Sequence, residues 1–254
     1  MQTSHDQGPL RDGDTVLRQA CPWTPNIHAL LAALPEHGFT AAPAPISFDA
    51  VWERVSYLPG ATGDLDSSRE MRTEKALRSA ASLLRHYHDC SALLLPCLER
   101  ELVWQLSSRE PAEIICHGDF APYNVLLNDG EVTGIIDFEA AHPGPRSWDI
   151  AYAIYRWAPL SSDVEVEGLG RLDDQIRRAR MFVDAYGMSI DARHLIPETI
   201  VARLEALLAF MEHEASRGVE RYRRNLQDGH DRIYRHDIAY VLKWSLEITA
   251  GLVD

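Results

Sequence analysis

The 254-residue chain lacks the features that define several classes of protein. No apolar run approaches the roughly 18 residues that a membrane-spanning helix needs, and the richest stretch, residues 91–98, is interrupted by Pro96. The first residues are polar and do not show the basic and apolar regions of a signal peptide. Internal repeats and low-complexity tracts are also absent. We therefore expect a cytoplasmic globular protein that does not bind membranes.

Lysine is scarce, since only Lys75 and Lys243 occur among 25 basic residues; these face 38 acidic residues and leave a formal net charge of −13. A protein that binds nucleic acid needs a cationic surface, so nucleic acid is not an expected partner. A cationic small molecule is compatible with an acidic surface, although the same charge also keeps a protein soluble. The four cysteines form no C-x-x-C pair and have no metal-ligand spacing, which favours reduced thiols.

The hydrophobic patterning predicts a small, partly β N-terminal part and a larger, mostly helical part with a β insert. Strand patterns occupy residues 15–18, 46–48 and 51–58, with a helical pattern over 27–34. Further helical patterns occupy residues 70–95, 98–106 and the chain beyond Trp148, and a β-rich stretch begins at Ile114. Because Pro59-Gly60 is a strong turn signal, we divide the chain into an N-terminal lobe, residues 1–58, and a C-terminal lobe, residues 59–254. The predicted fold class is α+β.

The most informative segment contains a predicted β-hairpin. Residues 125–127 and 132–136 are apolar strands, and Asn128-Asp129-Gly130 between them is a tight turn, because Asp-Gly tolerates positive φ. A hairpin brings its two ends together, so Asn124 before it and Asp137 after it are expected to lie close. An amide oxygen and a carboxylate that converge in this way are suitable ligands for Mg²⁺.

A second carboxylate precedes the hairpin. Asp119 lies five residues before Asn124, on a loop that Pro122 stiffens. This spacing places the Asp119 carboxylate near the metal but free to accept a proton. The order Asp, four residues, Asn, and then a second metal-binding Asp is that of a kinase catalytic loop, so the segment predicts phosphoryl transfer.

The details differ from those of protein kinases. His117-Gly118-Asp119 replaces His-Arg-Asp, and Asp137-Phe138-Glu139 lacks the final glycine of Asp-Phe-Gly. Together with residues 143–152, Pro-Gly-Pro-Arg-Ser-Trp-Asp-Ile-Ala-Tyr, this segment resembles the aminoglycoside phosphotransferase family of small-molecule kinases. The resemblance implies a protein-kinase-like two-lobed fold, with a reduced β-containing N-terminal lobe and a larger, mostly helical C-terminal lobe. It also implies an enzyme, a phosphotransferase with an alcohol group as acceptor.

The resemblance assigns roles to five residues of this segment and of the one that follows. Asp119 is the expected catalytic base, and Asn124 and Asp137 are the expected ligands of Mg²⁺. His117 is expected to order the loop without taking part in the chemistry. Asp149, which begins a helical run, is expected at the N-cap of that helix and also as a brace of the catalytic loop. Glu139, by contrast, is expected to face solvent.

The match is weaker in the N-terminal lobe. Ser56, Tyr57 and Leu58 look like the linker whose backbone holds the adenine of ATP or GTP. The strand that carries Arg18 stands where the family has a lysine, and the arginine fork can hold phosphate oxygens instead. The next helix offers His28 where an acidic partner is expected. Only seventeen residues precede Arg18, too few for the usual first strands and glycine-rich loop.

We thus expect a Mg²⁺-dependent kinase, monomeric or homodimeric, that transfers the γ-phosphoryl group of ATP or GTP to a hydroxyl of an aminoglycoside-like or other small metabolite. Acidic residues near the C-terminal helices add negative potential that favours a cationic acceptor such as an antibiotic, although a solvated loop explains them as well. They are Asp163, Glu165, Glu167, Asp173 and Asp174. The main alternative is a pseudokinase that binds a nucleotide or metabolite with weak or no phosphotransfer. A metallohydrolase is a remote alternative that leaves Asn124 unexplained; its ligands would be His117, Asp119, Asp137 and His142.

Overall fold

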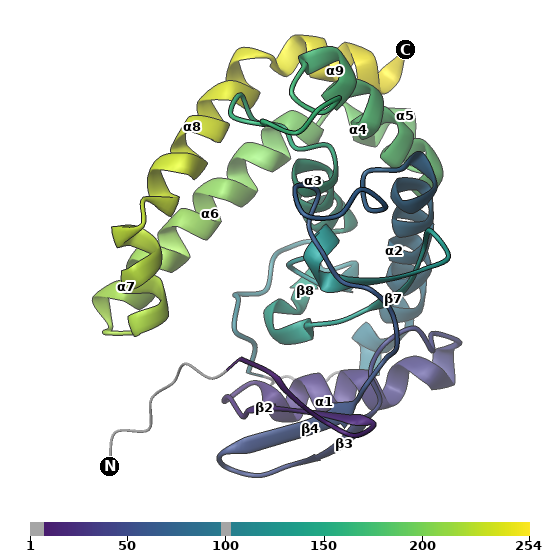
Figure 1. The fold of residues 1–254 in the computed structure, drawn as a ribbon, viewed down its shortest axis with the longest axis vertical. Helices are drawn as coiled ribbons and strands as arrows, with labels where there is room; N and C mark the ends of the chain where they lie inside the picture. Colours follow the sequence, from purple (N-terminus) through teal and green to yellow (C-terminus); the bar gives the residue numbers. More distant parts are fainter. Residues whose placement is uncertain (1–7, 98–102) are drawn as a thin grey trace. The chain divides into compact units, whose positions relative to one another are not determined.

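The structure is a computed structural model that describes residues 8–97 and 103–254 (Figure 1). Its chain forms two compact units, Met1–Asp149 and Ile150–Asp254. The first unit contains all the strands and the predicted site, and the second is helical. The predicted lobe boundary at residue 58 lies inside the first unit and stays a prediction.

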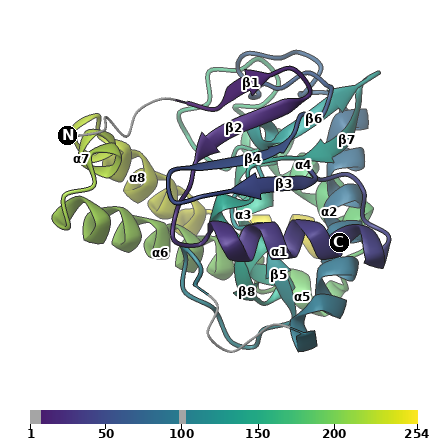
Figure 2. The ribbon, with the colours of Figure 1, turned by 90° about the horizontal axis from the view of Figure 1, so that it is seen from below.

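The N-terminal part of the first unit is a four-stranded antiparallel sheet with strand order β1-β2-β4-β3. The strands are β1 (Leu10–Asp12), β2 (Thr15–Gln19), β3 (Pro45–Phe48) and β4 (Trp52–Ser56). Helix α1 (Thr24–Ala33) continues as a 3₁₀ turn (Leu34–His37) and runs along the sheet, in contact with β3 (Figure 2). Ile27, Leu30 and Leu31 of α1 are buried, which explains why a short helix forms here. The predicted strands and helix of this region are confirmed.

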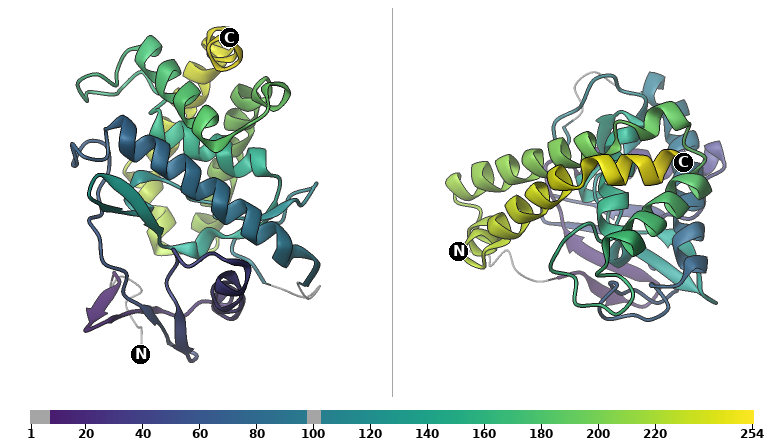
Figure 3. Two further views of the ribbon diagram at one scale, coloured as in Figure 1. Left: turned by 90° about the vertical axis from the view of Figure 1, so that its right-hand side faces the viewer. Right: turned by 90° about the horizontal axis from the view of Figure 1, so that it is seen from above.

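The remainder of the first unit is built around helix α2 (Glu74–Leu94). Thr73 caps its first turn, because the Thr73 hydroxyl accepts a hydrogen bond from the Ala76 N–H. One face of α2 is fully buried and packs on β5 (Ile114–Cys116) and β7 (Glu131–Ile135), beside the hairpin partner β6 (Val125–Asn128) (Figure 3). Strand β5 also pairs with β8 (His142–Gly144). Short 3₁₀ helices occupy Leu95–Cys97, Pro122–Asn124 and Phe138–Ala140.

The second unit confirms the prediction that the chain beyond Trp148 is helical. Its elements are the end of α3 (Arg146–Trp157), followed by α4 (Leu172–Tyr186), α5 (Ile190–Arg193), α6 (Ile196–Ser216), α7 (Glu220–Gln227), α8 (His230–Lys243) and α9 (Ser245–Val253). Helices α6 and α8 run side by side (Figures 1 and 3). Gly251 lets α9 approach α4, since a Cβ at this position would meet the Ile176 side chain at 2.1 Å.

Two further expectations from the sequence can be compared with the described residues. The helix predicted over 98–106 lies partly outside the described residues, and its described part, 103–106, is not helical. Throughout 8–97 and 103–254, no helix combines the length and the apolar character that crossing a bilayer requires.

Candidate active site

The predicted hairpin forms with its turn where the Asp-Gly pair requires it. Asp129 and Gly130 have φ values of 49° and 75°, and two successive positive values are typical of the type I′ turn that joins antiparallel strands. The strands pair as far as the Ile136 N–H, which donates to the Asn124 carbonyl at 2.9 Å. The hairpin therefore brings the backbone at Asn124 next to Asp137, as the sequence predicted.

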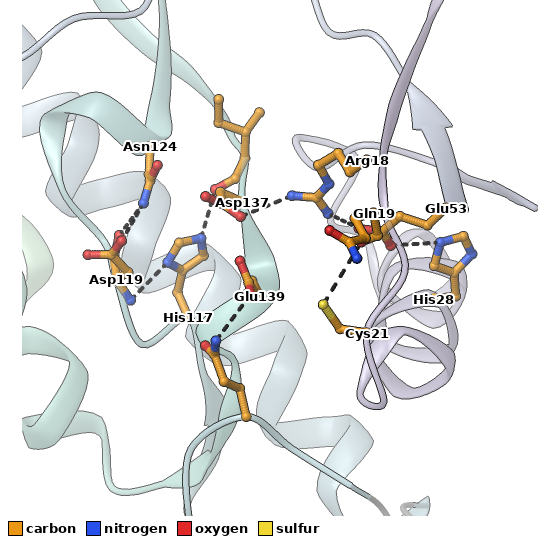
Figure 4. A network of polar contacts seen from close by, with 12 residues as sticks. Arg18, Gln19, Cys21, His28, Glu53, His117, Asp119, Asn124, Asp137 and Glu139 are labelled. Carbon is orange, nitrogen blue, oxygen red and sulfur yellow. Dashed lines mark hydrogen bonds and ion pairs between the residues drawn. The ribbon is translucent and has the colours of Figure 1, made fainter. Parts of the chain in front are cut away.

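Local contacts fix the carboxylate of Asp119. The Asn124 side-chain amide donates to the Asp119 carbonyl at 2.9 Å and to Asp119 Oδ2 at 2.8 Å, which turns the amide oxygen away from Asp119 (Figure 4). The Tyr123 hydroxyl donates to the other carboxylate oxygen, Oδ1, at 2.9 Å. Two neighbouring side chains thus orient one carboxylate through both of its oxygens.

Asp137 adopts a backbone conformation that residues other than glycine rarely use. Its φ of 62° and ψ of 65° lie in the left-handed region, which costs an ordinary residue about 1–2 kcal/mol. Its side chain is 45% exposed and accepts a hydrogen bond from Nη1 of Arg18 at 2.9 Å. Backbone strain of this kind is concentrated at functional sites, where the surrounding structure maintains it.

His117 connects the catalytic loop to the end of the hairpin. Its ring is buried, and its Nε2 lies 3.0 Å from the Ile136 carbonyl while its Nδ1 accepts the Asp119 N–H at 3.3 Å. These two contacts fix the orientation of the ring between the loop and the end of the hairpin. These contacts support the predicted ordering role of His117.

Asp149 stabilises the backbone of the same loop. Its carboxylate is fully buried and accepts hydrogen bonds from the backbone N–H groups of His117 at 2.6 Å and Gly118 at 2.9 Å, and its Oδ2 lies 3.0 Å from Nε2 of His88. Burial alone would raise the pKa of Asp149, but the hydrogen bond and charge of His88, the charge of His117 and the Gly118 N–H lower it to about 2. Burial also lowers the pKa of His88, although Asp149 acts in the opposite direction.

This geometry corrects one expectation and supports another. Helix α3 begins at Arg146, so Asp149 lies within its first turn and the interpretation as N-cap is wrong. The alternative role, bracing the catalytic loop, agrees with its two hydrogen bonds to the loop backbone. The loop also requires Gly118, whose φ is +82° and whose Cβ, if present, would lie 2.2 Å from the Ala140 carbonyl oxygen.

Arg18 lies on β2 with its guanidinium between two carboxylates. Nη2 contacts Glu53 of β4 at 2.8 Å and Nη1 contacts Asp137 (Figure 4). His28 of α1, expected in place of the acidic partner, instead contacts Glu53, with its Nε2 3.2 Å from Oε2. The acidic partner of Arg18 is therefore supplied by a strand and not by the helix. Burial lowers the pKa of His28, although Glu53 acts to raise it.

The predicted adenine linker is held by the sheet. The Ser56 N–H donates to the Ala44 carbonyl and the Ser56 hydroxyl accepts the Ala44 N–H, each at 2.8 Å. The Tyr57 N–H donates to the Asp14 carbonyl at 2.8 Å. The N–H groups of Ser56 and Tyr57 are thus already used, and the role of Ser56, Tyr57 and Leu58 in binding adenine stays a prediction.

The side chains of Asn124 and Asp137 offer oxygen ligands that fit Mg²⁺. The cation prefers oxygen ligands and is often held by one or two carboxylates plus substrate phosphates, which matches one amide and one partly exposed carboxylate. Within 8–97 and 103–254 no group of three or more His, Cys, Asp or Glu side chains is arranged to hold a metal. The described residues thus do not gather the ligands of the metallohydrolase alternative at one point, and its fourth residue, His142, has Nδ1 2.9 Å from the Ala140 carbonyl.

Sequence reasoning missed three residues of the site and misplaced a fourth. Tyr123 and His88 had no motif to mark them, although Tyr123 lies four residues after Asp119. Glu53 could be found only from the strand register that sets it opposite Arg18. Glu139, expected to face solvent, is half-buried and accepts a hydrogen bond from Gln105 at 3.1 Å.

Comparisons with known proteins agree with the motif. Residues 92–183 match the model of the phosphotransferase enzyme family, and this range contains every predicted residue from His117 to Asp149. A trifolitoxin immunity protein of Rhizobium leguminosarum bv. trifolii is 27% identical over 215 residues, which cover 81% of this chain and 77% of that protein. A homoserine kinase of Neisseria meningitidis is 35% identical over 99 residues, or 39% of this chain, and the chain spans only 28% of its length.

Solved structures extend the likeness over most of the chain at the level of the fold. A putative aminoglycoside phosphotransferase from Ralstonia eutropha has a TM-score of 0.61 and 12% identity, covering 90% of this chain and 86% of that one. An amicoumacin kinase in complex with AMP-PNP and Ca²⁺ has a TM-score of 0.58 and 11% identity, covering 87% of each chain. The predicted α+β, protein-kinase-like fold is confirmed. The resemblance to the aminoglycoside phosphotransferase family is likewise confirmed, because residues 92–183 match the phosphotransferase enzyme family and the fold is that of kinase-like small-molecule phosphotransferases.

Proposed function

We propose that this protein is a small-molecule kinase that transfers the γ-phosphoryl group of ATP or GTP to a hydroxyl group of a small metabolite. The observation that carries the proposal is the arrangement of Asp119, Asn124 and Asp137, which follow the order of a kinase catalytic loop. Asn124 and Asp137 flank one hairpin, and Asn124 donates a hydrogen bond to Asp119 on the loop before it. The family match and the kinase fold support the enzyme class, a phosphotransferase with an alcohol group as acceptor.

Asp119 acts as the base in this proposal. A carboxylate that orients the acceptor hydroxyl accepts its proton as the bond to phosphorus forms. Tyr123 and Asn124 hold the carboxylate in one orientation, so little reorganisation is needed when the acceptor binds. His117 and Asp149 fix the backbone beneath it.

Asn124 and Asp137 would hold Mg²⁺. When bound there, the cation would supply positive charge against the phosphates of the nucleotide. The side chain of Asp137 is 45% exposed, so it is accessible to a metal–nucleotide complex. Arg18 contacts the same carboxylate and serves in the proposal as the cation that holds the α- and β-phosphates.

The acceptor class remains broad. Of the similar proteins, one is named a homoserine kinase and another an amicoumacin kinase, so their names point to different acceptors. We therefore propose a hydroxyl-bearing small molecule, aminoglycoside-like or other. The five acidic residues of the second unit give only modest support for a cationic acceptor, because three of them already have partners within the unit. Asp173 contacts Arg171, Asp174 contacts Arg177 and Asp163 contacts His236.

A second candidate is a pseudokinase that binds a nucleotide or metabolite without efficient transfer. The observation that favours it is the replacement of the expected lysine by Arg18, which is not a conservative change at a phosphate site. Both candidates predict nucleotide binding, so only turnover separates them.

The test is Mg²⁺-dependent ATP and GTP turnover with a panel of hydroxyl acceptors, measured for the wild type, Asp119→Asn and a control, Asp129→Asn. We expect turnover with at least one acceptor and a loss of about 10²–10⁴-fold in Asp119→Asn, because the proton acceptor is removed. Asp129→Asn should be unaffected, since asparagine suits the type I′ turn. Nucleotide binding without turnover would favour the pseudokinase, and turnover that Asp119→Asn leaves intact would refute the assignment of the base.

A further inference from the structure

The first unit contains a chain of charged and polar side chains that links α1 to the hairpin. It runs from His28 through Glu53 and Arg18 to Asp137, with contacts of 3.2, 2.8 and 2.9 Å (Figure 4). The central pair is fixed by the sheet, because Arg18 and Glu53 are directly opposite each other in the register of β2 and β4. Strand pairing therefore brings a carboxylate to Arg18 independently of any ligand.

The two ends of the Arg18 fork differ in their surroundings. Glu53, which holds Nη2, has a side chain that is 8% exposed, whereas Asp137, which holds Nη1, is 45% exposed. Removing one partner of a buried ion pair leaves an uncompensated charge, while an exposed pair is weakened by solvent and salt. The contact with Glu53 is therefore the permanent one, and the contact with Asp137 is the one that can be exchanged.

The remaining polar atoms agree with this division. The second oxygen of Glu53, Oε2, faces Nε2 of the buried His28, so both oxygens of the carboxylate are engaged. The His28 ring is held in turn by an edge contact with Phe48, with ring centroids 4.9 Å apart. In the described part of the chain, the buried Nε of Arg18 has no hydrogen-bond partner, so only the two Nη atoms hold the guanidinium.

We propose that Glu53 is the positioning residue of Arg18: it anchors one arm of the guanidinium so that the other arm passes from Asp137 to a phosphate oxygen when a nucleotide binds. The inference rests on the proposed function, because it assigns Arg18 to the phosphates. It goes further by naming a strand carboxylate, supported by His28, as the group that keeps the clamp in place. Asp137 is thereby released toward its own ligand.

The experiment measures dissociation constants by titration calorimetry for ATP with Mg²⁺, ATP in EDTA, and adenosine. The variants are Glu53→Gln, Arg18→Met and their combination. The control is Glu131→Gln, which alters an exposed glutamate of the hairpin that pairs with Lys75 of α2. Glu53→Gln should weaken ATP binding tenfold to a hundredfold with and without Mg²⁺, because a charged hydrogen bond to phosphate is lost. Adenosine binding should not change, and Glu53→Gln should add no further loss to Arg18→Met.

Each outcome decides the matter. ATP affinity in Glu53→Gln within twofold of the wild type, or an equal loss for ATP and adenosine, overturns the positioning role. The wild type could bind ATP and transfer phosphate to no acceptor, while Glu53→Gln still shows the expected loss of ATP affinity. That result supports the positioning role of Glu53 and refutes the kinase proposal. A wild type that binds no nucleotide overturns both.

A second measurement applies where Glu53→Gln does not fold. In a crystal structure of the wild type with a non-hydrolysable ATP analogue, we expect Nη2 to remain on Glu53 and Nη1 to contact a phosphate oxygen. An Arg18 that leaves Glu53, or that stays on Asp137 without touching the nucleotide, overturns the inference.

Discussion

Replacing the buried Asp149 by asparagine tests how the catalytic loop is held. The carboxylate accepts hydrogen bonds from the backbone N–H groups of His117 and Gly118 and contacts His88, all within the interior. In Asp149→Asn one acceptor oxygen becomes an NH₂ group, which leaves at least one buried N–H without an acceptor. A hydrogen bond to a charged group contributes about 1.5–3 kcal/mol, and an unsatisfied buried donor costs about 1–3 kcal/mol.

We therefore expect the free energy of unfolding to fall by about 3 kcal/mol in Asp149→Asn, measured by urea denaturation at pH 7. Asp89→Asn, on the residue after His88, is the matched control. Its carboxylate is 46% exposed and pairs with Arg85 and Arg146, so its loss should cost less than about 1 kcal/mol. A change below about 0.5 kcal/mol in Asp149→Asn would refute the reasoning.

The same residue predicts a pH dependence. The pKa of Asp149 is about 2 in the folded protein against an ordinary value of 3.8, so ionisation favours folding by about 2 kcal/mol. Because the folded-state pKa is depressed, this contribution is complete above about pH 4 and is lost as the pH falls toward 2. The stability difference between wild type and Asp149→Asn should therefore narrow over this window, and a difference independent of pH would contradict the ionised state.

Two further variants test the loop. Gly118→Ala should lower the free energy of unfolding by more than about 2 kcal/mol in a urea titration, because Gly118 has positive φ and an added Cβ would clash with Ala140. The control is Gly13→Ala, which has positive φ but open space around it and should lose only about 1 kcal/mol. Equal losses in the two variants would argue against the close approach of Gly118 to Ala140. Tyr123→Phe should lower kcat about fivefold with little change in KM, because Asp119 loses one orienting hydrogen bond worth about 1 kcal/mol. Steady-state kinetics with the acceptor identified in the panel would check this, and an unchanged kcat would exclude an orienting role.

The sequence by itself determined the parts of the site that depend on neighbouring residues. The Asp129-Gly130 turn sets the hairpin, and the hairpin sets the approach of Asn124 to Asp137. The spacing of Asp119 from Asn124 likewise places them on one short loop. Such features can be predicted from sequence because few intervening residues are involved and their backbone preferences are strong.

Only the tertiary structure decided which distant residues support that loop. Arg18 and Glu53 meet through a strand register across 35 positions, and Asp149 meets His88 across 61. Asp149 also shows why the predicted N-cap was wrong. An aspartate near the start of a helix often caps it, but here the carboxylate accepts hydrogen bonds from two backbone N–H groups of another segment. A carboxylate accepts whichever donors packing brings within reach, and the identity of those donors is set by long-range packing that residue spacing does not encode.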